Sequence, residues 1–496
     1  MLFNSITFAV FFVVVTLLYF ILPYRWRWLL LLIASCYFYM FFLPIYILIL
    51  FFTIIIDYFA GIYIEKAEGK QRKIFLFASI IANVGILAIF KYYNFFIDNI
   101  NGIFAVNSNI SLPYLEILLP IGLSFHTFQA MSYTIEVYRG KQKAEYHFGI
   151  YALYVMFYPQ LVAGPIERPQ NVLHQFREKY DFDYQRVTDG LKLMAWGLFK
   201  KVVIADKFAL LTNQIYDNPQ NYDGIALIIA TIFFSFQIYC DFSGYSDMAL
   251  GSAQVMGFKL MKNFDSPYLS KNISEFWGRW HISLSTWFRD YLYIPLGGNR
   301  VSVPRWYFNL FVVFMVSGFW HGANWTFIIW GALHGLYLII AIIKNNLLAK
   351  INLSITNPII LKTSRFIDVI FTLGLVFFAW IFFRAKNLSD ATYIVTHLFD
   401  NIAHKLIHIQ DYLQGGGFFS KFIGIESQHF YAFDYIWCVF LIILLFVTDY
   451  ISKNKRLIER INQLPLFVRW SIYYLLAITI IFMGQNEELQ FIYFQF

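Results

Sequence analysis

Long hydrophobic segments, separated by short polar or charged stretches, recur along the whole chain. Single apolar runs, each near the length of a membrane-spanning α-helix, lie at residues 5–22, 74–90, 115–137, 225–250, 366–383, 431–447 and 468–483. The run over 306–343 is long enough for two spans, and the run over 28–60 is interrupted by Pro44 and fits a short hairpin. The runs are too long and too poorly alternating for barrel strands. The pattern therefore predicts an all-helical polytopic membrane protein with about 10 to 12 helical segments.

Two parts of the middle of the chain are less regular. Residues 149–163 are apolar but short and run into the sequence Pro-Gln-Leu-Val-Ala-Gly-Pro, which favours a re-entrant or broken helix. Residues 259–305 are basic, rich in tryptophan and interrupted by glycine and proline, a pattern typical of interfacial helices on the cytoplasmic face. The sequence contains no repeat, low-complexity block or soluble domain, so we predict a single membrane domain over residues 1–496.

Composition supports this interpretation and excludes several other classes. Hydrophobic residues make up 59% of the chain and charged residues 14%, which excludes a disordered chain, a coiled coil and an ordinary cytosolic enzyme. The net charge of +8 reflects basic loops of a membrane protein and does not indicate nucleic-acid binding. The sequence contains no Walker motif, GxGxxG after a strand, HExxH, CxxC or GxSxG. Any catalysis must therefore use polar residues held within the membrane domain.

Basic residues near the two ends predict the orientation. Arg25 and Arg27 follow the first apolar run, and a basic loop over 453–460 precedes the last one. Because lysine and arginine favour cytoplasmic loops, both termini are expected to be extracytoplasmic. No basic segment precedes the first run and no cleavage site follows it, so it is interpreted as a span rather than a cleaved signal.

The strongest group of candidate site residues lies between positions 276 and 335. His321 stands between Trp320 and Gly322 in the centre of an apolar hairpin, where an imidazole is costly unless it is hydrogen-bonded or catalytic. A structural histidine satisfied by a backbone carbonyl is the alternative. His281 lies in an amphipathic segment with Arg279 and Arg289, and the alternative there is an interfacial histidine among snorkelling cations.

Other polar residues in apolar segments have simpler interpretations. His334 follows His321 by 13 residues, so the two cannot share one helix face, and packing is expected for it. Asp241 and Asp247 lie in a run of small residues, where tight packing with one buried ion pair is the favoured interpretation. The polar stretch with His397, His404 and His408 gives only weak support for metal binding, and no metal site is predicted.

The chain ends in the aromatic segment Gln-Phe-Ile-Tyr-Phe-Gln-Phe over 490–496. An aromatic anchor at the membrane interface is the simple interpretation. Tyr493 also carries a phenol, which can act as a covalent nucleophile when a nearby base takes its proton.

Several motifs together resemble the membrane-bound O-acyltransferase family, in particular its alginate O-acetyltransferase-like branch with peptidoglycan and cellulose relatives. They are Arg-Trp-His-Ile-Ser-Leu-Ser-Thr-Trp-Phe-Arg-Asp-Tyr (279–291), Phe-Trp-His-Gly-Ala-Asn-Trp (319–325), Tyr-Pro-Gln-Leu-Val-Ala-Gly-Pro-Ile-Glu-Arg (158–168), Tyr-Cys-Asp-Phe-Ser-Gly-Tyr-Ser-Asp (239–247) and Tyr-Ile-Pro-Leu-Gly-Gly-Asn-Arg (293–300). The similarity is strongest over residues 115–345.

The resemblance implies a ring of tilted transmembrane and re-entrant helices around a central tunnel. It implies that His321 is catalytic and that His281 is the second important histidine. Arg279 and Arg289 suit the phosphates of coenzyme A, and Trp320 and Asn324 are assigned to substrate binding. The related D-alanylation proteins use a small partner with a tyrosine-bearing tail, which makes Tyr493 an acyl-relay candidate.

The resulting hypothesis is O-acetylation of a cell-envelope polysaccharide from cytoplasmic acetyl-CoA, with no bound cofactor. It places the chain in the bacterial inner membrane, with an extracytoplasmic partner of the SGNH-hydrolase type completing transfer to the polysaccharide. Three alternatives stay open: D-alanyl transfer to teichoic acid, a polysaccharide or lipid flippase without covalent chemistry, and a scaffold in an export complex.

Overall fold

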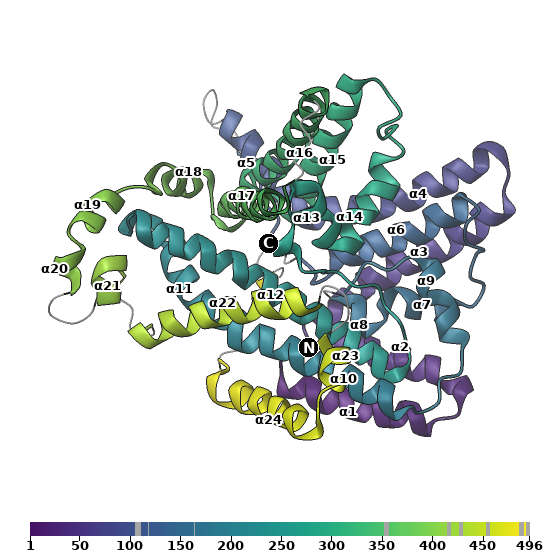
Figure 1. Ribbon diagram of the computed structural model, residues 1–496. Coiled ribbons are helices and arrows are strands. Elements are labelled where there is room, and N and C mark those ends of the chain that lie inside the picture. Colours follow the sequence, from purple (N-terminus) through teal and green to yellow (C-terminus); the bar gives the residue numbers. More distant parts are fainter. Residues whose placement is uncertain are drawn as a thin grey trace. The chain divides into compact units, whose positions relative to one another are not determined.

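The computed structural model of the chain describes residues 1–104, 111–117, 119–162, 164–351, 357–413, 418–425, 430–452, 457–485 and 491–492 (Figure 1). Every regular element in these residues is helical, and the described ranges contain no strand. The prediction of an all-helical protein is therefore confirmed. The arrangement of the helices in a ring around a tunnel stays a prediction.

Seven helices within the described residues are long and apolar enough to cross a membrane. They are Pro44–Lys66, Gly69–Phe104, Gly224–Met256, Trp325–Lys350, Lys362–Arg384, Ala432–Ser452 and Leu466–Met483. A shorter apolar helix covers Ile6–Ile21. These helices make the chain a multi-pass membrane protein, as the hydrophobic pattern predicts.

The chain folds into two compact units. One contains Met1–Gly197 and Tyr245–Lys262, and the other contains Leu198–Gly244 and Asn263–Ile492. The boundary between the units falls within helix α10 (Tyr184–Phe199) and within helix α12 (Gly224–Met256), so each of these two helices contributes residues to both units. The assignment of one domain over the whole chain stays a prediction.

The remaining helices of the first unit are α1 (Ile6–Ile21), α2 (Tyr24–Met40), α3 (Ile47–Lys66), α4 (Gly69–Leu87), α5 (Tyr93–Phe104), α6 (Leu123–Tyr138), α7 (Phe148–Met156), α8 (Tyr158–Leu161) and α9 (Pro169–Val172). The break between α2 and α3 falls at Pro44, and the break between α7 and α8 falls just before Pro159. Both breaks confirm the interrupted segments that the sequence predicts.

The remaining helices of the second unit are α11 (Asp206–Asp217), α13 (Ile273–Arg279), α14 (Ile282–Phe288), α15 (Val303–His321), α16 (Trp325–Ile351), α17 (Pro358–Arg384), α18 (Leu388–His397), α19 (Ile402–Ile407), α20 (Ile409–Leu413), α21 (Phe418–Ile423), α22 (Ala432–Ser452), α23 (Leu457–Asn462) and α24 (Leu466–Met483). The run over 306–343 forms two helices, α15 and α16, which lie side by side (Figure 1), and of the two only α16 is among the seven long apolar helices.

One prediction about an individual segment is wrong. The expected span over 115–137 is only the buried helix α6, because Gly122 adopts a left-handed φ of 76° and the chain before it is not helical. In the tryptophan-rich segment 259–305, Trp277, Trp280 and Trp287 are buried, whereas Ile294 and Val303 are exposed, and its location at a membrane interface stays a prediction. Other aromatic rings cover Trp280, which packs against Phe276 and Trp380.

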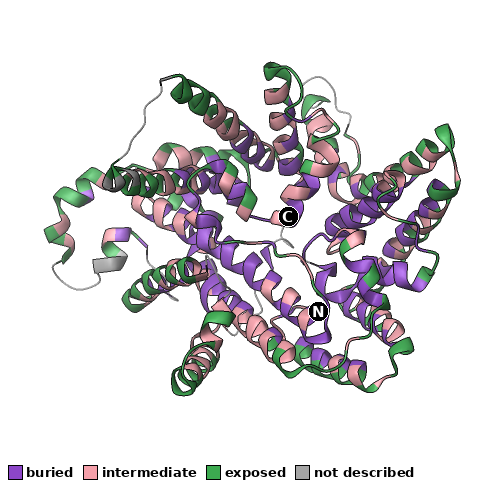
Figure 2. Cartoon of the chain, turned by 45° about the vertical axis from the view of Figure 1, so that its right-hand side comes forward, coloured by how far each residue is buried: buried purple, intermediate pink, exposed green. Residues whose placement is uncertain are grey.

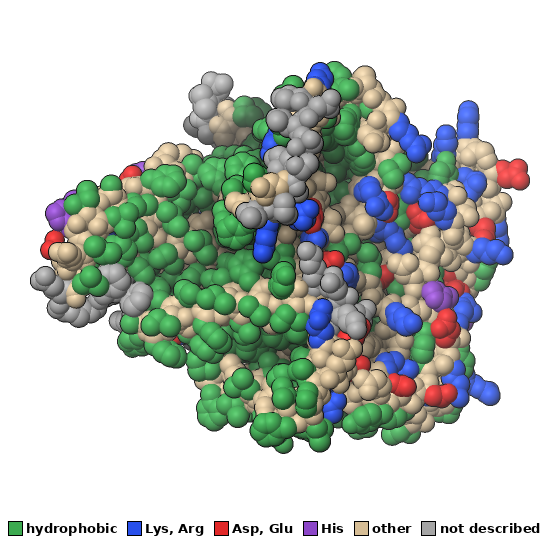
Figure 3. Space-filling model, in the orientation of Figure 1, with side chains coloured by type: hydrophobic (Ala, Val, Ile, Leu, Met, Phe, Trp, Pro, Cys, Tyr) green, Lys and Arg blue, Asp and Glu red, His purple; other side chains and the backbone are tan. Residues whose placement is uncertain are grey.

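Several long helices are buried along one side only. Figure 2 shows them with buried residues on one side and exposed residues on the other. Figure 3 shows hydrophobic side chains over α22 and α24, where Val439, Ile443, Ile478 and Ile481 are exposed. Because water would disfavour such faces, we interpret them as lipid-facing.

A polar cluster inside the first unit joins three neighbouring helices. The Asp57 carboxylate on α3 accepts hydrogen bonds from Asn83 Nδ2 on α4, at 3.0 and 2.8 Å, and from Ser79 Oγ at 2.6 Å. Ser79 Oγ also lies 3.0 Å from Thr134 Oγ1 on α6. All four side chains are buried, so their hydrogen bonds have no water to replace them.

Replacing Asn83 with leucine should lower the free energy of unfolding by about 1–3 kcal/mol, because the buried Asp57 loses its amide donor. The measurement is an SDS titration of the purified protein in mixed micelles. Val84→Leu changes an exposed side chain in the same helix and is the matched control, with an expected change within about 0.5 kcal/mol. Equal unfolding midpoints for the two variants would show that the cluster does not stabilise the helix packing.

Candidate functional site

Helices α15 and α16 cross at direct backbone contact. A Cβ atom at Gly318 would lie 2.2 Å from the carbonyl oxygen of Phe327, and one at Gly331 would lie 2.3 Å from that of Phe314. No other residue fits at either position without moving the partner helix. This close crossing brings the end of α15, where His321 lies, against the first turns of α16.

His321 is the last residue of α15 and lies in an aromatic enclosure. Its ring centroid is 5.0 Å from that of Trp320, 5.1 Å from that of Trp330 and 5.4 Å from that of Phe383. The side chain is 4% exposed. Gly322 ends the helix, and a Cβ atom there would lie 2.1 Å from the Phe327 ring. The glycine of the Trp-His-Gly motif is therefore required by local packing.

His281 is also buried, and its backbone is strained. It precedes α14 with φ 44° and ψ 55°, a left-handed conformation that costs an L-residue about 1–2 kcal/mol. Its neighbours are fixed by Asn263, whose backbone oxygen accepts from Ile282 N–H and whose Oδ1 accepts from Ser283 Oγ at 2.6 Å. A strained residue held this firmly is a candidate functional residue.

The environment of His281 keeps its imidazole neutral. The centroid of its ring lies 4.6 Å from that of Phe242. The side chain is fully buried, and the residue belongs to none of the seven long apolar helices. Burial lowers the pKa of His281 to about 3. The interpretation of His281 as an exposed interfacial histidine is therefore wrong, because the protein rather than the membrane surface surrounds it.

Trp320 contacts the rings of both histidines. Its ring centroid is 5.0 Å from that of His321 and 6.5 Å from that of His281. The two predicted histidines, 40 positions apart in the sequence, therefore meet at one tryptophan within one compact unit. Their assignment as catalytic residues remains a prediction.

The other intramembrane histidines have hydrogen-bond partners that suit a packing role. Nδ1 of His334 accepts a hydrogen bond from Trp277 Nε1 at 3.2 Å, and Nε2 of His126 lies 2.6 Å from Thr53 Oγ1. His334 lies on α16, whereas His321 lies on α15. The expectation that His321 and His334 cannot share one helix face therefore does not apply, because they belong to different helices. Both rings nevertheless contact Trp330, each with a centroid distance of 5.1 Å.

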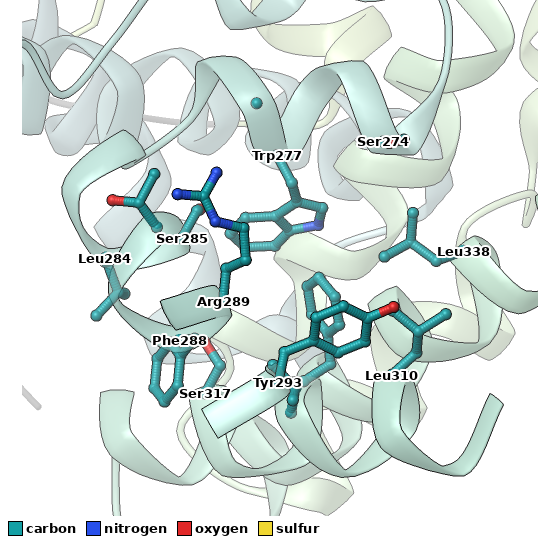
Figure 4. A pocket seen from close by; sticks show the side chains of 14 residues that line it. Ser274, Trp277, Leu284, Ser285, Phe288, Arg289, Tyr293, Leu310, Ser317 and Leu338 are labelled. Carbon is teal, nitrogen blue, oxygen red and sulfur yellow. The ribbon is translucent and has the colours of Figure 1, made fainter. Parts of the chain in front are cut away.

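A cavity of about 420 Å³ is lined by residues of α13, α14, α15 and α16 (Figure 4). Its walls include Trp277, Leu284, Arg289 and Ser317, and Figure 4 shows the Arg289 guanidinium beside Trp277. Ser317 precedes His321 by about one helical turn, and Leu284 follows His281 by three residues. The cavity thus combines mostly apolar walls with one cation and approaches both histidine-bearing segments.

The remaining predicted binding residues have structural contacts. Arg289 Nε pairs with Asp290 at 2.9 Å, and Arg279 Nη2 pairs with Glu275 at 2.7 Å. Asn324 Nδ2 donates to the backbone oxygen of Lys386 at 3.0 Å, which ties the α15–α16 turn to the end of α17. These contacts do not test substrate binding, which stays a prediction for all three predicted residues and for Trp320.

Two further predictions concern the chain end and metal binding. Tyr493 lies outside the described residues. Among the residues that the structure describes, no group of three or more His, Cys, Asp or Glu side chains is arranged to hold a metal ion.

One buried ion cluster was only partly predicted from the sequence. Lys201 Nζ lies 2.7 Å from Asp206 Oδ1 and 2.8 Å from Asp241 Oδ1. The expected buried ion pair of Asp241 is confirmed, but its partner was missed. Lys201 follows Lys200 in a segment with equal numbers of acidic and basic residues, a pattern that resembles a solvated loop.

Comparisons with known proteins agree with the motifs at this site. The model of the membrane-bound O-acyltransferase family matches residues 138–385, a segment that contains both His281 and His321. The peptidoglycan O-acetyltransferase of Helicobacter pylori is 34% identical over 496 residues, which cover 94% of this chain and 91% of that protein. The probable alginate O-acetylase AlgI of Pseudomonas aeruginosa is 39% identical over 396 residues, which cover 79% of this chain and 73% of that protein.

A more distant similarity covers less than half of the chain. The teichoic acid D-alanyltransferase of Streptococcus thermophilus is 32% identical over 241 residues, which cover 44% of this chain and 56% of that protein. The family match, the near full-length relative and the apolar helices agree with one another. The chain therefore belongs to the membrane-bound O-acyltransferase family and is a membrane-embedded acyltransferase.

Proposed function

We propose that this protein moves acetyl groups from cytoplasmic acetyl-CoA across the bacterial inner membrane for O-acetylation of a cell-envelope polysaccharide. The observation that carries the proposal is the burial of His281 and His321, whose rings both contact Trp320. The names of the relatives, a peptidoglycan O-acetyltransferase and a probable alginate O-acetylase, support peptidoglycan or an alginate-like exopolysaccharide as the acceptor.

The proposed chemistry is an acyl transfer assisted by His321. The imidazole takes the proton of an attacking hydroxyl or phenol, whose oxygen forms a bond to the thioester carbonyl carbon. The carbon–sulfur bond breaks, and the proton passes to the leaving thiolate, which gives an acetyl ester and coenzyme A. The aromatic rings around His321 exclude water, which would otherwise compete as the nucleophile.

The donor is proposed to enter from the cavity lined by Trp277, Leu284, Arg289 and Ser317. Its mostly apolar walls suit the narrow thioester arm, and the guanidinium of Arg289 suits a phosphate group. Arg279, at the end of α13, is proposed to add positive charge for the same phosphates, and Trp320 and Asn324 to contact the substrate. No bound cofactor is required by this scheme.

The acceptor side is proposed to involve a relay and a second protein. Tyr493 would carry the acetyl group as a phenyl ester on the extracytoplasmic side, where both termini are expected. An SGNH-hydrolase-type partner would then transfer it to the polysaccharide. D-alanyl transfer to teichoic acid is the alternative reaction, and donor competition between acetyl and D-alanyl substrates distinguishes the two.

Replacing His321 with alanine should lower acetyl transfer at least about 100-fold, because the attacking group loses its base. The measurement is transfer of radiolabelled acetyl groups from acetyl-CoA by the protein in proteoliposomes. His126→Gln alters a buried histidine in the other compact unit and should retain near-normal activity per folded molecule. A flippase or scaffold requires no labelled ester, so unchanged transport without ester formation would contradict the proposal.

Replacing His281 with asparagine removes the imidazole but keeps a residue that tolerates the left-handed backbone. We expect a raised KM for acetyl-CoA, a turnover at least about tenfold lower, or both, because the group beside Trp320 is lost. Initial rates at varied acetyl-CoA concentration provide the measurement. If both constants equal those of the wild type, His281 has only a packing role.

Replacing Tyr493 with phenylalanine keeps the ring and removes the nucleophilic oxygen. Polysaccharide acetylation should stop, and mass spectrometry of the wild-type protein should detect an acetyl ester on this tyrosine. Tyr474→Phe changes an exposed tyrosine of α24 and should leave acetylation intact. Normal acetylation in the Tyr493 variant would leave the tail as an ordinary aromatic anchor.

A further inference from the structure

Three charged side chains form a cluster in the interior of the second unit. Lys201 lies on the π-helical turn η4 (Lys200–Ala205), Asp206 begins α11, and Asp241 lies in the middle of α12. All three are nearly inaccessible to solvent. Burial alone would lower the pKa of Lys201, but the charges of Asp241 and Asp206 outweigh it and raise that pKa. Two carboxylates thus face one ammonium.

The last described residues of the chain end at this cluster. The backbone N–H of Ile492 donates a hydrogen bond to Asp241 Oδ2 at 2.7 Å. Phe491 and Ile492 are 0% and 2% exposed. These two residues are therefore packed in the interior of the protein beside the cluster.

The start of the same segment is also attached to the π-helical turn. The backbone N–H of Gln485, directly after α24, donates to the carbonyl oxygen of Val202 at 3.1 Å. Val202 is the neighbour of Lys201. Turn η4 therefore holds one end of the segment through its backbone, and it supplies the ammonium that pairs with the carboxylate at the other end.

The docked residues lie next to the candidate site. The Phe491 ring centroid is 5.8 Å from that of Phe242, and the Phe242 ring centroid is 4.6 Å from that of His281. Phe242 follows Asp241 in α12. Asp241 accepts the hydrogen bond from Ile492, and the ring of Phe242 contacts the ring of Phe491. Tyr493 is the next residue after Ile492 in the sequence.

The geometry points to Asp241 as the docking residue for Phe491 and Ile492, with Lys201 orienting its carboxylate so that Phe491 is held against Phe242, the neighbour of His281. Both carboxylate oxygens are used, Oδ1 by the ammonium and Oδ2 by the amide of Ile492. A charged acceptor strengthens such a bond, and the interior offers the amide no water in its place. Asp241 is thus a positioning residue. Its relevance to catalysis rests on the proposed acetyl relay, whereas the docking itself does not.

Asp241→Asn provides a sharp test because an amide has one acceptor and one donor end. If its oxygen stays with Lys201, its amino group faces the N–H of Ile492, and the hydrogen bond to the tail is lost. Asp206→Asn is the matched control. Asp206 also forms an ion pair with Lys201, but the hydrogen bond from Ile492 is accepted by Asp241. Ile492→Pro is a second variant, which removes the N–H donor and leaves every charged residue in place.

The readout is hydrogen–deuterium exchange of the full-length protein in micelles, followed by mass spectrometry of a C-terminal peptide that begins at or before Leu489. We expect exchange at least about tenfold faster in the Asp241→Asn variant than in the wild type and Asp206→Asn. In the Ile492→Pro variant, which has no amide hydrogen at 492, the neighbouring tail amides should exchange faster. Exchange in α15 and α16 should be unchanged in all three variants. Wild-type protection of the tail in both Asp241→Asn and Ile492→Pro would overturn the inference.

Kinetics separate this inference from the proposed function. If the relay operates, Asp241→Asn should lower the turnover with little change in KM for acetyl-CoA, because donor binding does not use the tail. Faster tail exchange with unchanged turnover would support docking and contradict the Tyr493 relay. Unchanged exchange would contradict docking whatever the turnover.

Discussion

Polar groups enclosed by aromatic rings, without access to water, are the constraint on which the rest of this structure depends. An imidazole or carboxylate in such surroundings costs free energy unless its neighbours are fixed to suit it. Lys201 meets this requirement for Asp241 through an ion pair, whereas Trp320, Trp330 and Phe383 enclose His321 and fix the position of its ring.

A network of tryptophans connects the elements that carry the site. Trp277 on α13 lies 5.7 Å from Trp330 on α16, which stacks at 5.7 Å on Trp380 of α17, and Trp280 lies 5.0 Å from Trp380. Large rigid rings lose little conformational freedom on packing and offer well-defined contact geometry. Such a network suits an enzyme that must hold a donor and an imidazole in a fixed relation. His321 contacts it directly through Trp330.

The same constraint relates the charged cluster to the chemistry. Asp241 and Phe242 are consecutive residues, yet one contacts the tail through its carboxylate and the other lies against both Phe491 and His281. The candidate histidine and the chain end are therefore attached to one segment of α12. A change at this segment would affect the positions of both.

The sequence by itself determined the helical class, the membrane location and several helix breaks, because hydrophobic length and the effects of proline and glycine are local. It also identified His321, since the Trp-His-Gly motif interrupts an apolar run long enough for two helices. Only the tertiary structure decided that His281 is buried beside Trp320, because its basic neighbours resemble those of an exposed amphipathic segment. The same holds for the bond from Ile492 to Asp241, which joins residues 251 positions apart. Local patterns specify what each segment is able to do, whereas packing between distant segments selects which polar groups meet.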